Sequence, residues 1–462
     1  MAENTQLKRA MSERQVRMIG LASGIGTGLF LSSGYTIHTA GAFGTILAYT
    51  VGAILVYLIM LSLAELSIAM PVTGSFHYYA QKLIGPATGF LVAISYWLTW
   101  TVALGSEFTA IGIVMQRWFP TVPAWAFSAI FIVIIFLSNL FSVKVFGESE
   151  YWLASIKVVA IIAFLLLGSM VLLGWLHVSG DVHPGFDNIF SHGLFPNGIG
   201  QVFTTMLAVN FAFSGTELMG VTAGEAKNPE KAIPSAIKAV WWRQVIFFIG
   251  SITILAAILP YQKAGVTESP FVAVFDMIGI PYAADVMNFV IITGILSMAN
   301  SGLYASTRML WSLSHEKLIH PIFEKTNKQG IPVWALLASL AGGLLALLSS
   351  FVAAGALYLN LVAVSGLAVV FVWIAIAWSH YKYSQQLKNQ GRQKDLRYPK
   401  WAYPLLPLAG FIGASLSVIL TIFDPQQRPA LLWSVPFVGL VYAYYFVRFK
   451  WLPILKKKST EV

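Results

Sequence analysis

Apolar residues fill twelve stretches of the chain, and short polar joints separate these stretches. A membrane-spanning helix needs about 20 consecutive apolar residues, and each stretch has roughly that length. The pattern predicts spans over residues 16–39, 43–69, 87–116, 122–141, 150–174, 199–224, 237–260, 282–311, 333–350, 354–380, 402–423 and 430–448. The sequence therefore predicts an all-α polytopic membrane protein with twelve transmembrane helices.

Two of the predicted spans are interrupted near the middle by glycine and polar residues. The first interruption reads Ser23-Gly24-Ile25-Gly26-Thr27-Gly28, and the second reads Phe213-Ser214-Gly215-Thr216-Glu217. Within a bilayer, unwound backbone is tolerated only where it is buried in protein or lines a cavity. Broken helices at corresponding positions in the two halves of a chain indicate a transporter's substrate site. The two interruptions therefore favour a transport function.

The placement of the interruptions also predicts how the chain is organised. The polar joint from Tyr381 to Lys400 separates ten spans from a final pair. Because the first and the sixth span are both interrupted, we expect a five-plus-five inverted repeat. The predicted parts are a cytoplasmic segment 1–15, a transport core 16–380 with repeats 16–174 and 199–380, a cytoplasmic loop 381–401, helices 11 and 12 over 402–448, and a cytoplasmic tail 449–462.

Composition agrees with a membrane location and excludes several other classes. The chain is 57% hydrophobic and 10% charged, against roughly 25% charged residues in a soluble domain. It has no cysteine, which excludes disulfides and thiolate metal sites. The histidines show no metal-ligand spacing, and no catalytic or nucleotide motif stands out. We expect no enzyme activity, no metal, no cofactor and no nucleic-acid partner.

The basic residues predict the orientation in the membrane. Basic residues gather beside spans on the cytoplasmic side, and Lys8, Arg9, Arg14 and Arg17 precede the first span. With the N-terminus inside, most of the 29 Lys and Arg residues fall on cytoplasmic segments or span ends. The exceptions are Arg117, Lys263 and Arg428 outside, and Lys157 within a span. Both termini are therefore expected in the cytoplasm.

The first interruption suits a carboxylate. It frees backbone N–H groups at the start of a half-helix, where the partial positive charge attracts anions. Glycines at positions 24, 26 and 28 permit close approach of a ligand. The same glycines also fit a small-residue contact between helices. The presence of a second interruption favours a binding site over such packing alone.

The second interruption suits an amine. We expect the carbonyl groups of Phe211, Ala212 and Ser214 to lack helical partners there, and such carbonyls accept hydrogen bonds from an ammonium group. Together the two breaks offer donors to a carboxylate and acceptors to an amine, which a free α-amino acid carries on one carbon. Phe211 is a candidate gate over such a ligand, and simple packing is the alternative.

Lys157 lies seven residues into its predicted span, among apolar neighbours. A charge inside a span costs several kcal/mol, roughly 2.5–3.5 on insertion scales, so such residues are usually functional. Removal from water disfavours the ammonium form, which makes Lys157 a candidate proton carrier. The alternative is a structural cation that neutralises a carboxylate or a helix C-terminus.

Three acidic residues are candidates for supporting roles. Glu107 lies deep in the third span, where it can hold a substrate amine or act on Lys157. Glu217 lies inside the second interruption, where capping of the broken helix is the favoured interpretation. Glu225 lies in the following cytoplasmic turn, where a capping or gating role competes with plain solvation.

Several segments resemble the bacterial amino acid permeases of the amino acid–polyamine–organocation superfamily, amino acid transporter family. These segments are residues 23–30, 71–79, 146–152, 213–225 and 300–308, and the resemblance runs from Leu7 to Phe446. It implies a five-plus-five inverted repeat with two further helices, in the bacterial inner membrane. It also implies proton-driven uptake of an amino acid, so that the partners are an amino acid, a proton and the lipid bilayer.

The resemblance assigns roles to individual positions. The glycine motif, here Ile25, Gly26, Thr27 and Gly28 with Ser23 before it, would bind the substrate carboxylate. Carbonyls of Phe211, Ala212 and Ser214 would bind the amine, with Phe211 as the gate. Lys157 takes the place that sodium occupies in related sodium-driven carriers, and Glu107 matches an acidic position near the pocket.

The sequence leaves the substrate and the coupling open. Much of the chain resembles permeases for arginine, lysine and ornithine, which often carry Phe-Gln-Gly-Thr-Glu in the sixth span. Ser214 departs from that pattern and is closer to alanine- or serine-type permeases. An amino acid exchanger, which needs no proton site, is the alternative mechanism. A transport-inactive sensor is less favoured, because such proteins usually carry a long soluble signalling domain.

Overall fold

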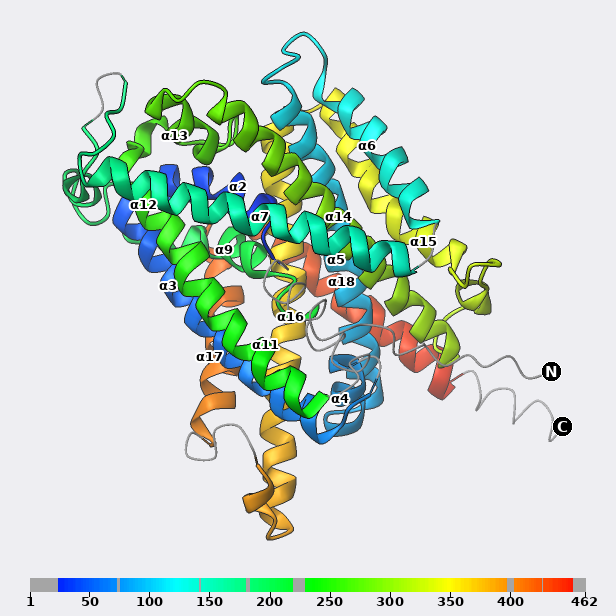
Figure 1. Cartoon of the computed structure of the whole chain (residues 1–462). Coiled ribbons are helices and arrows are strands. Elements are labelled where there is room, and N and C mark those ends of the chain that lie inside the picture. Colours follow the sequence, from blue (N-terminus) through cyan, green and yellow to red (C-terminus); the bar gives the residue numbers. More distant parts are fainter. Residues whose placement is uncertain are drawn as a thin grey trace, which may run out of the picture.

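The computed structural model describes residues 24–72, 75–140, 143–179, 183–218, 229–396, 403–425 and 427–451, and this part of the chain contains helices and no strand. The main helices are α2 (Thr27–Phe30), α3 (Ser32–Ala69), α4 (Phe76–Leu83), α5 (Pro86–Met115), α6 (Ala124–Asn139), α7 (Val143–Leu172), α8 (Gly200–Thr204), α9 (Met206–Phe213), α11 (Pro229–Arg243), α12 (Ser251–Ile258), α13 (Pro270–Ile278), α14 (Ala283–His315), α15 (Val333–Leu340), α16 (Ala354–Asn389), α17 (Leu405–Ile419) and α18 (Arg428–Phe446) (Figure 1).

Short 3₁₀ and π segments complete or connect these helices. The π-helix Gln244–Gly250 joins α11 to α12, and the 3₁₀-helix Ala341–Ser350 extends α15. The remaining short segments are Phe186–Ile189, Tyr261–Lys263, Pro321–Glu324, Gln393–Asp395, Leu420–Phe423 and Val447–Trp451.

Within the described residues, nine helices are long and apolar enough to cross a membrane, and two shorter apolar helices cover 124–139 and 200–213. The predicted first and second spans meet at Gly41 inside α3, where a φ of +76° interrupts the helix. Pro196 lies against Gly41, so a side chain at this position would clash as well as strain the backbone. The all-helical prediction is confirmed for the described residues, whereas the number of twelve spans, the inverted repeat and the side on which the termini lie stay predictions.

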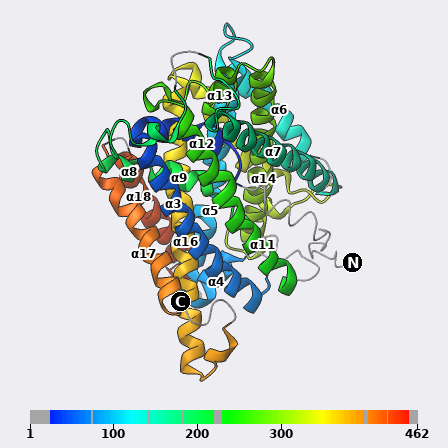
Figure 2. The ribbon, with the colours of Figure 1, turned by 60° about the vertical axis from the view of Figure 1, so that its left-hand side comes forward.

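Three helices form the centre of the bundle. Helix α5 packs against both α14 and α16, and Trp100 of α5 and Trp373 of α16 are almost completely buried. Gly302 of α14 makes room for the Trp100 ring, because a methyl group there would lie 2.2 Å from the ring carbon Cε3. By contrast, α17 and α18 lie at one side of the bundle (Figure 2), and α18 is exposed along most of its length.

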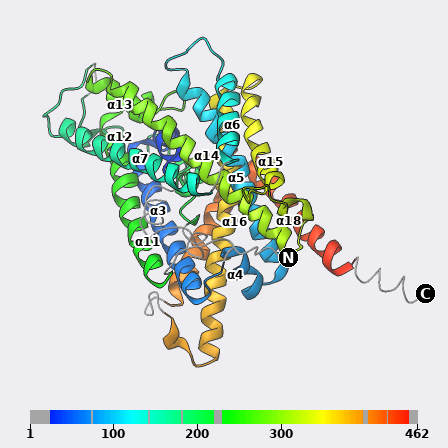
Figure 3. The same ribbon diagram turned by 45° about the vertical axis from the view of Figure 1, so that its right-hand side comes forward.

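The end of the bundle near α13 is closed over α2. The hydroxyl group of Ser269, which precedes α13, donates a hydrogen bond to the carbonyl of Phe30 at 2.6 Å. Gly34 in α3 contacts the backbone of Gly265, where even a methyl group would not fit. At the same end, where α13 lies beside α14 (Figure 3), Arg117 follows α5 and binds Glu268, Asp276 and Asp285.

Candidate functional site

The first interruption folds as the glycine pattern predicts. Gly24 has a φ of +83°, which disfavours residues with a side chain, and α2 begins three residues later at Thr27. Helix α2 ends at Phe30, and Leu31 at a φ of −124° separates it from α3. Ile25, Thr27 and Phe30 are all fully buried. The unwound backbone is therefore enclosed by protein, as the membrane requires. Ser23 lies outside the described residues.

The second interruption follows α9 and is held by its own side chains. Gly215 has a φ of +91° and ends the helical path after Ser214. The Gly215 N–H group donates to Glu217 Oε1 at 3.0 Å, and Trp373 Nε1 donates to Glu217 Oε2 at 3.4 Å. The buried carboxylate therefore satisfies the free backbone within the break, which is the capping geometry expected of it. Glu225 lies outside the described residues.

One expectation about the second interruption is wrong. The Phe211 carbonyl was expected to lack a partner, but it accepts hydrogen bonds from the Ser214 N–H group at 3.0 Å and the Ser214 hydroxyl at 2.7 Å. The physical reason is that serine has a short side chain, which bonds readily to nearby backbone. The carbonyls of Ala212 and Ser214 instead face Gly24, with the Ser214 oxygen 3.0 Å from where a Cβ on Gly24 would lie.

The two interruptions, far apart in the sequence, lie against each other. Helix α2 packs beside α9 (Figure 1). A methyl group on Gly28 would lie 2.4 Å from Ala212 Cα and 3.0 Å from its nitrogen. A Cβ on Gly215 would lie 3.1 Å from the backbone nitrogen of Gly24, so these two glycines are also in close contact. The small-residue contact and the break are thus one feature, because glycine brings the two unwound backbones together.

Lys157 joins the first interruption to α14. Its side chain is fully buried. The ammonium group donates to the Ile25 carbonyl at 3.2 Å and to Ser297 Oγ at 2.9 Å. A hydrogen bond to a charged donor inside protein is worth more than one between neutral groups. The lysine therefore fixes the unwound backbone of residue 25 relative to α7 and α14.

Glu107 lies on the other side of the same break. The Thr27 hydroxyl donates to Glu107 Oε1 at 3.0 Å, and the Thr27 carbonyl accepts a hydrogen bond from Tyr358 at 3.0 Å. Glu107 is 2% exposed, and its second oxygen, Oε2, has no hydrogen-bond partner among the described residues. A buried carboxylate oxygen without a partner costs free energy, so it is suited to accept a donor from a ligand.

Several residues around the breaks are not apparent from the sequence alone. Arg243 was grouped with the cytoplasmic basic residues, but the structure buries it and directs a guanidinium N–H to Thr216 in the second break. Its position six residues into a predicted span was the available signal, as it was for Lys157. Tyr49 and Tyr358 donate to the Gly28 and Thr27 carbonyls. Nothing in the local sequence distinguishes these tyrosines from packing residues.

Phe211 is buried, with 4% of its surface exposed, and its Cβ lies close to Gly366 of α16. Its role as a gate stays a prediction. In the described part of the chain, His, Asp and Glu do not gather into a group of three or more that could hold a metal ion.

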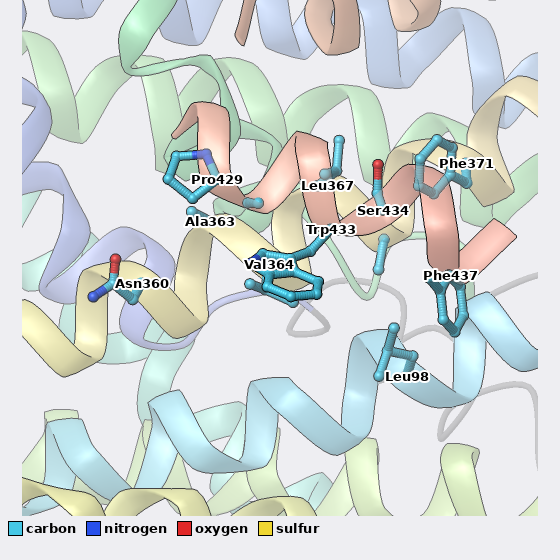
Figure 4. Close-up of a pocket in the computed structure, with 12 residues that line it drawn as sticks. Leu98, Asn360, Ala363, Val364, Leu367, Phe371, Pro429, Trp433, Ser434 and Phe437 are labelled. Atoms are coloured by element: carbon cyan, nitrogen blue, oxygen red, sulfur yellow. The ribbon is translucent and has the colours of Figure 1, made fainter. Parts of the chain in front are cut away.

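A cavity of about 380 Å³ lies away from the breaks, among α5, α16 and α18 (Figure 4). Leu98, Phe371, Trp433 and Phe437 give it apolar walls, and Asn360 and Ser434 add the polar groups. None of the residues of the two breaks lines it. Its lining is therefore mostly apolar, unlike the polar backbone of the two breaks.

Comparison with known proteins gives a consistent result over nearly the whole chain. Residues 15–457 match the family described as amino acid permease. The "Putative histidine permease" of Bacillus subtilis is 54% identical over 443 residues, covering 95% of this chain and 93% of the relative. The amino-acid permease RocC of B. subtilis is 46% identical, covering 99% and 98%. The lysine-specific permease LysP of Lactococcus lactis is 41% identical, covering 95% and 87%.

Proposed function

The chain belongs to the amino acid permease family and is a membrane transporter of amino acids rather than an enzyme, and from this premise we propose that it imports a basic amino acid by proton symport. The single observation that carries the proposal is the buried Lys157 ammonium group, bonded to the carbonyl of Ile25 in the first break. The positively charged Lys157 fixes the unwound backbone of the first break, and gain or loss of its proton changes the hydrogen bond to the Ile25 carbonyl.

The two adjacent breaks form the proposed binding site for the main-chain groups of the substrate. Backbone N–H groups of residues 25–28, at the start of α2, would receive the carboxylate. Carbonyls of Ala212 and Ser214, which face this segment, would receive the amine. The Phe211 carbonyl joins them once the Ser214 hydroxyl turns away from it. Alternating access would then open this site to each side of the membrane in turn.

Two observations support a substrate with a basic side chain. The relatives include proteins described as histidine and lysine permeases, and Glu107 offers a carboxylate oxygen without a partner beside the first break. The serine at position 214 is the sequence feature that favours a small neutral substrate. Because its hydroxyl group donates to the Phe211 carbonyl, Ser214 supports a small neutral substrate less than its position in the sequence implies.

The direct test is transport by purified protein in liposomes. We expect labelled histidine, lysine or arginine to accumulate when the outside is more acidic than the inside, and labelled alanine and serine to remain near equilibrium. Collapse of the pH gradient with a protonophore is the control. Rapid exchange of internal for external amino acid without net accumulation would support the exchanger and refute proton symport.

Replacement Glu107→Gln tests the side-chain contact. It keeps the hydrogen bond from Thr27 but removes the charge that would bind a basic side chain. A hydrogen bond to a charged group contributes about 1.5–3 kcal/mol, so affinity for lysine or arginine should fall roughly ten- to a hundredfold. Binding is measured by competition against the labelled substrate. The exposed Glu148→Gln is the matched control, and equal affinity for lysine in both variants would remove Glu107 from the site.

A further inference from the structure

Glu150 is a buried carboxylate for which the binding site described above has no role. It is the first residue of the apolar window of α7 and is 4% exposed. Its Oε1 atom accepts a hydrogen bond from the hydroxyl group of Ser297, on α14. The same hydroxyl oxygen accepts a hydrogen bond from the Lys157 ammonium group at 2.9 Å. The donors and acceptors therefore run in one direction, from Lys157 through Ser297 to Glu150.

The helix geometry explains why these three groups meet. Seven residues separate Glu150 from Lys157, which is about two turns and about 10 Å along the axis. Residues at this spacing share a helix face, and long side chains in a helix point toward its N-terminus. Lys157 therefore extends toward Glu150, and the two side chains meet the same residue of α14. A single serine hydroxyl closes the remaining gap.

We infer that Glu150 receives the proton released by Lys157, by way of the Ser297 hydroxyl, and passes it to water. This inference rests on the proposed proton symport and adds a release path to it. An N–H bond of Lys157 breaks as an O–H bond forms on Ser297, whose own hydroxyl proton forms an O–H bond on Glu150. The ammonium and carboxylate thus become a neutral amine and a carboxylic acid, without any other reactant. Glu150 then gives the proton to water and is a carboxylate again.

Glu150 lies close to the N-terminal end of α7. Glu148, on the preceding half-turn of α7, is exposed. On α14, Asn300 is buried and Ser301, one turn beyond Ser297, is half-buried. On the other side, Lys157 is fully buried beneath the first break. Along α7, the carboxylate therefore lies between an enclosed proton carrier and the exposed Glu148.

Few other charged groups compete for this role. Glu107 from α5 and Arg243 at the end of α11 are the other charges that act on Lys157, and they bind Thr27 and Thr216, respectively. The segments of α12 and of the π-helix 244–250 that pack on α7 have no charged residue. Asp276 of α13 is bound to Arg117. Among the hydrogen bonds of the described residues, the one from Lys157 to the Ser297 hydroxyl group continues to Glu150.

The test separates proton release from substrate exchange in liposomes, with labelled histidine and labelled lysine as probes in parallel. Glu150→Gln keeps the size of the side chain and a hydrogen-bond acceptor but cannot take up the proton. We expect this variant to exchange internal for external probe at nearly the wild-type rate, while accumulation driven by a pH gradient falls to the level without a gradient. Ser297→Ala, which breaks the path at a neutral residue, should give the same separation. Glu148→Gln should accumulate normally.

Three results would overturn the inference. Normal accumulation by Glu150→Gln and Ser297→Ala would show that the proton leaves by another route. Equal loss of exchange and accumulation in both variants, with a lower melting temperature, would make Glu150 a structural counter-charge for Lys157. If the wild-type protein itself exchanges but never accumulates the probes, proton symport fails, and the inference fails with it.

Discussion

Replacement of Lys157 by arginine is expected to abolish accumulation of substrate against its gradient while the protein still folds. Arginine keeps a positive charge for the Ile25 carbonyl and Ser297. Its guanidinium group holds its proton so tightly that fewer than about one in 10⁵ side chains loses it at neutral pH. If transport depends on release of this proton, Lys157→Arg should therefore not accumulate substrate. If the lysine is only a structural cation, arginine should take over its role and accumulation should continue. The measurement is uptake of labelled amino acid into liposomes with an acidic exterior.

Two further variants complete this experiment. Lys157→Ala removes the charge altogether and leaves the buried Glu150 without its cation, so we expect a lower melting temperature as well as loss of uptake. Lys238→Ala removes an exposed lysine and should leave both properties unchanged. Full pH-dependent accumulation by Lys157→Arg would show that the lysine is only a structural cation.

Replacement Gly28→Ala should weaken substrate binding more than any other single methyl group added to the first break. The new Cβ would lie 2.4 Å from Ala212 Cα, and real contacts of this kind are never so short, so the two breaks must move apart. Overpacking of this kind costs about 1–3 kcal/mol, which corresponds to a roughly five- to 150-fold change in affinity. The dissociation constant of the purified protein measures the part of this cost that falls on substrate binding. Its melting temperature measures the part that falls on folding stability.

Gly439→Ala is the matched control, because Gly439 also lies in a helix, α18, and a Cβ there would meet nothing within 4 Å. Alanine favours helix over glycine by about 0.5–1 kcal/mol, so this variant should be as stable as the wild type or slightly more stable. Unchanged affinity of Gly28→Ala would mean that the breaks can separate without disturbing the site, and would argue against their contact as the binding surface.

The sequence was sufficient to predict the features that a membrane imposes directly. Long apolar runs must be helices in lipid, and an unwound segment must be enclosed, so the helical class and the two interruptions could be predicted from residue pattern alone. Lys157 could be identified for the same reason, because a charge in an apolar run needs an explanation. These arguments need no knowledge of which helices are neighbours.

The remaining contacts depend on which helices are neighbours, and the sequence does not contain that information locally. Ser297 and Tyr358 are ordinary residues of long helices until α14 and α16 are placed beside the first break. Glu150 sits at the start of a span, where an acidic residue usually faces water. The Phe211 carbonyl was mispredicted because a serine three residues later folds back onto it, a local detail that the glycine pattern conceals.

The contact between Gly28 and Ala212 has a consequence for how this protein can vary in evolution. Most tight contacts between side chains permit paired substitutions, in which a larger residue at one position is offset by a smaller one at the other. Here the atoms nearest to position 28 include the Cα and the nitrogen of residue 212, which every amino acid possesses. Even glycine at position 212 would not make room. Among related permeases, position 28 should therefore be fixed as glycine and show no covariation with position 212.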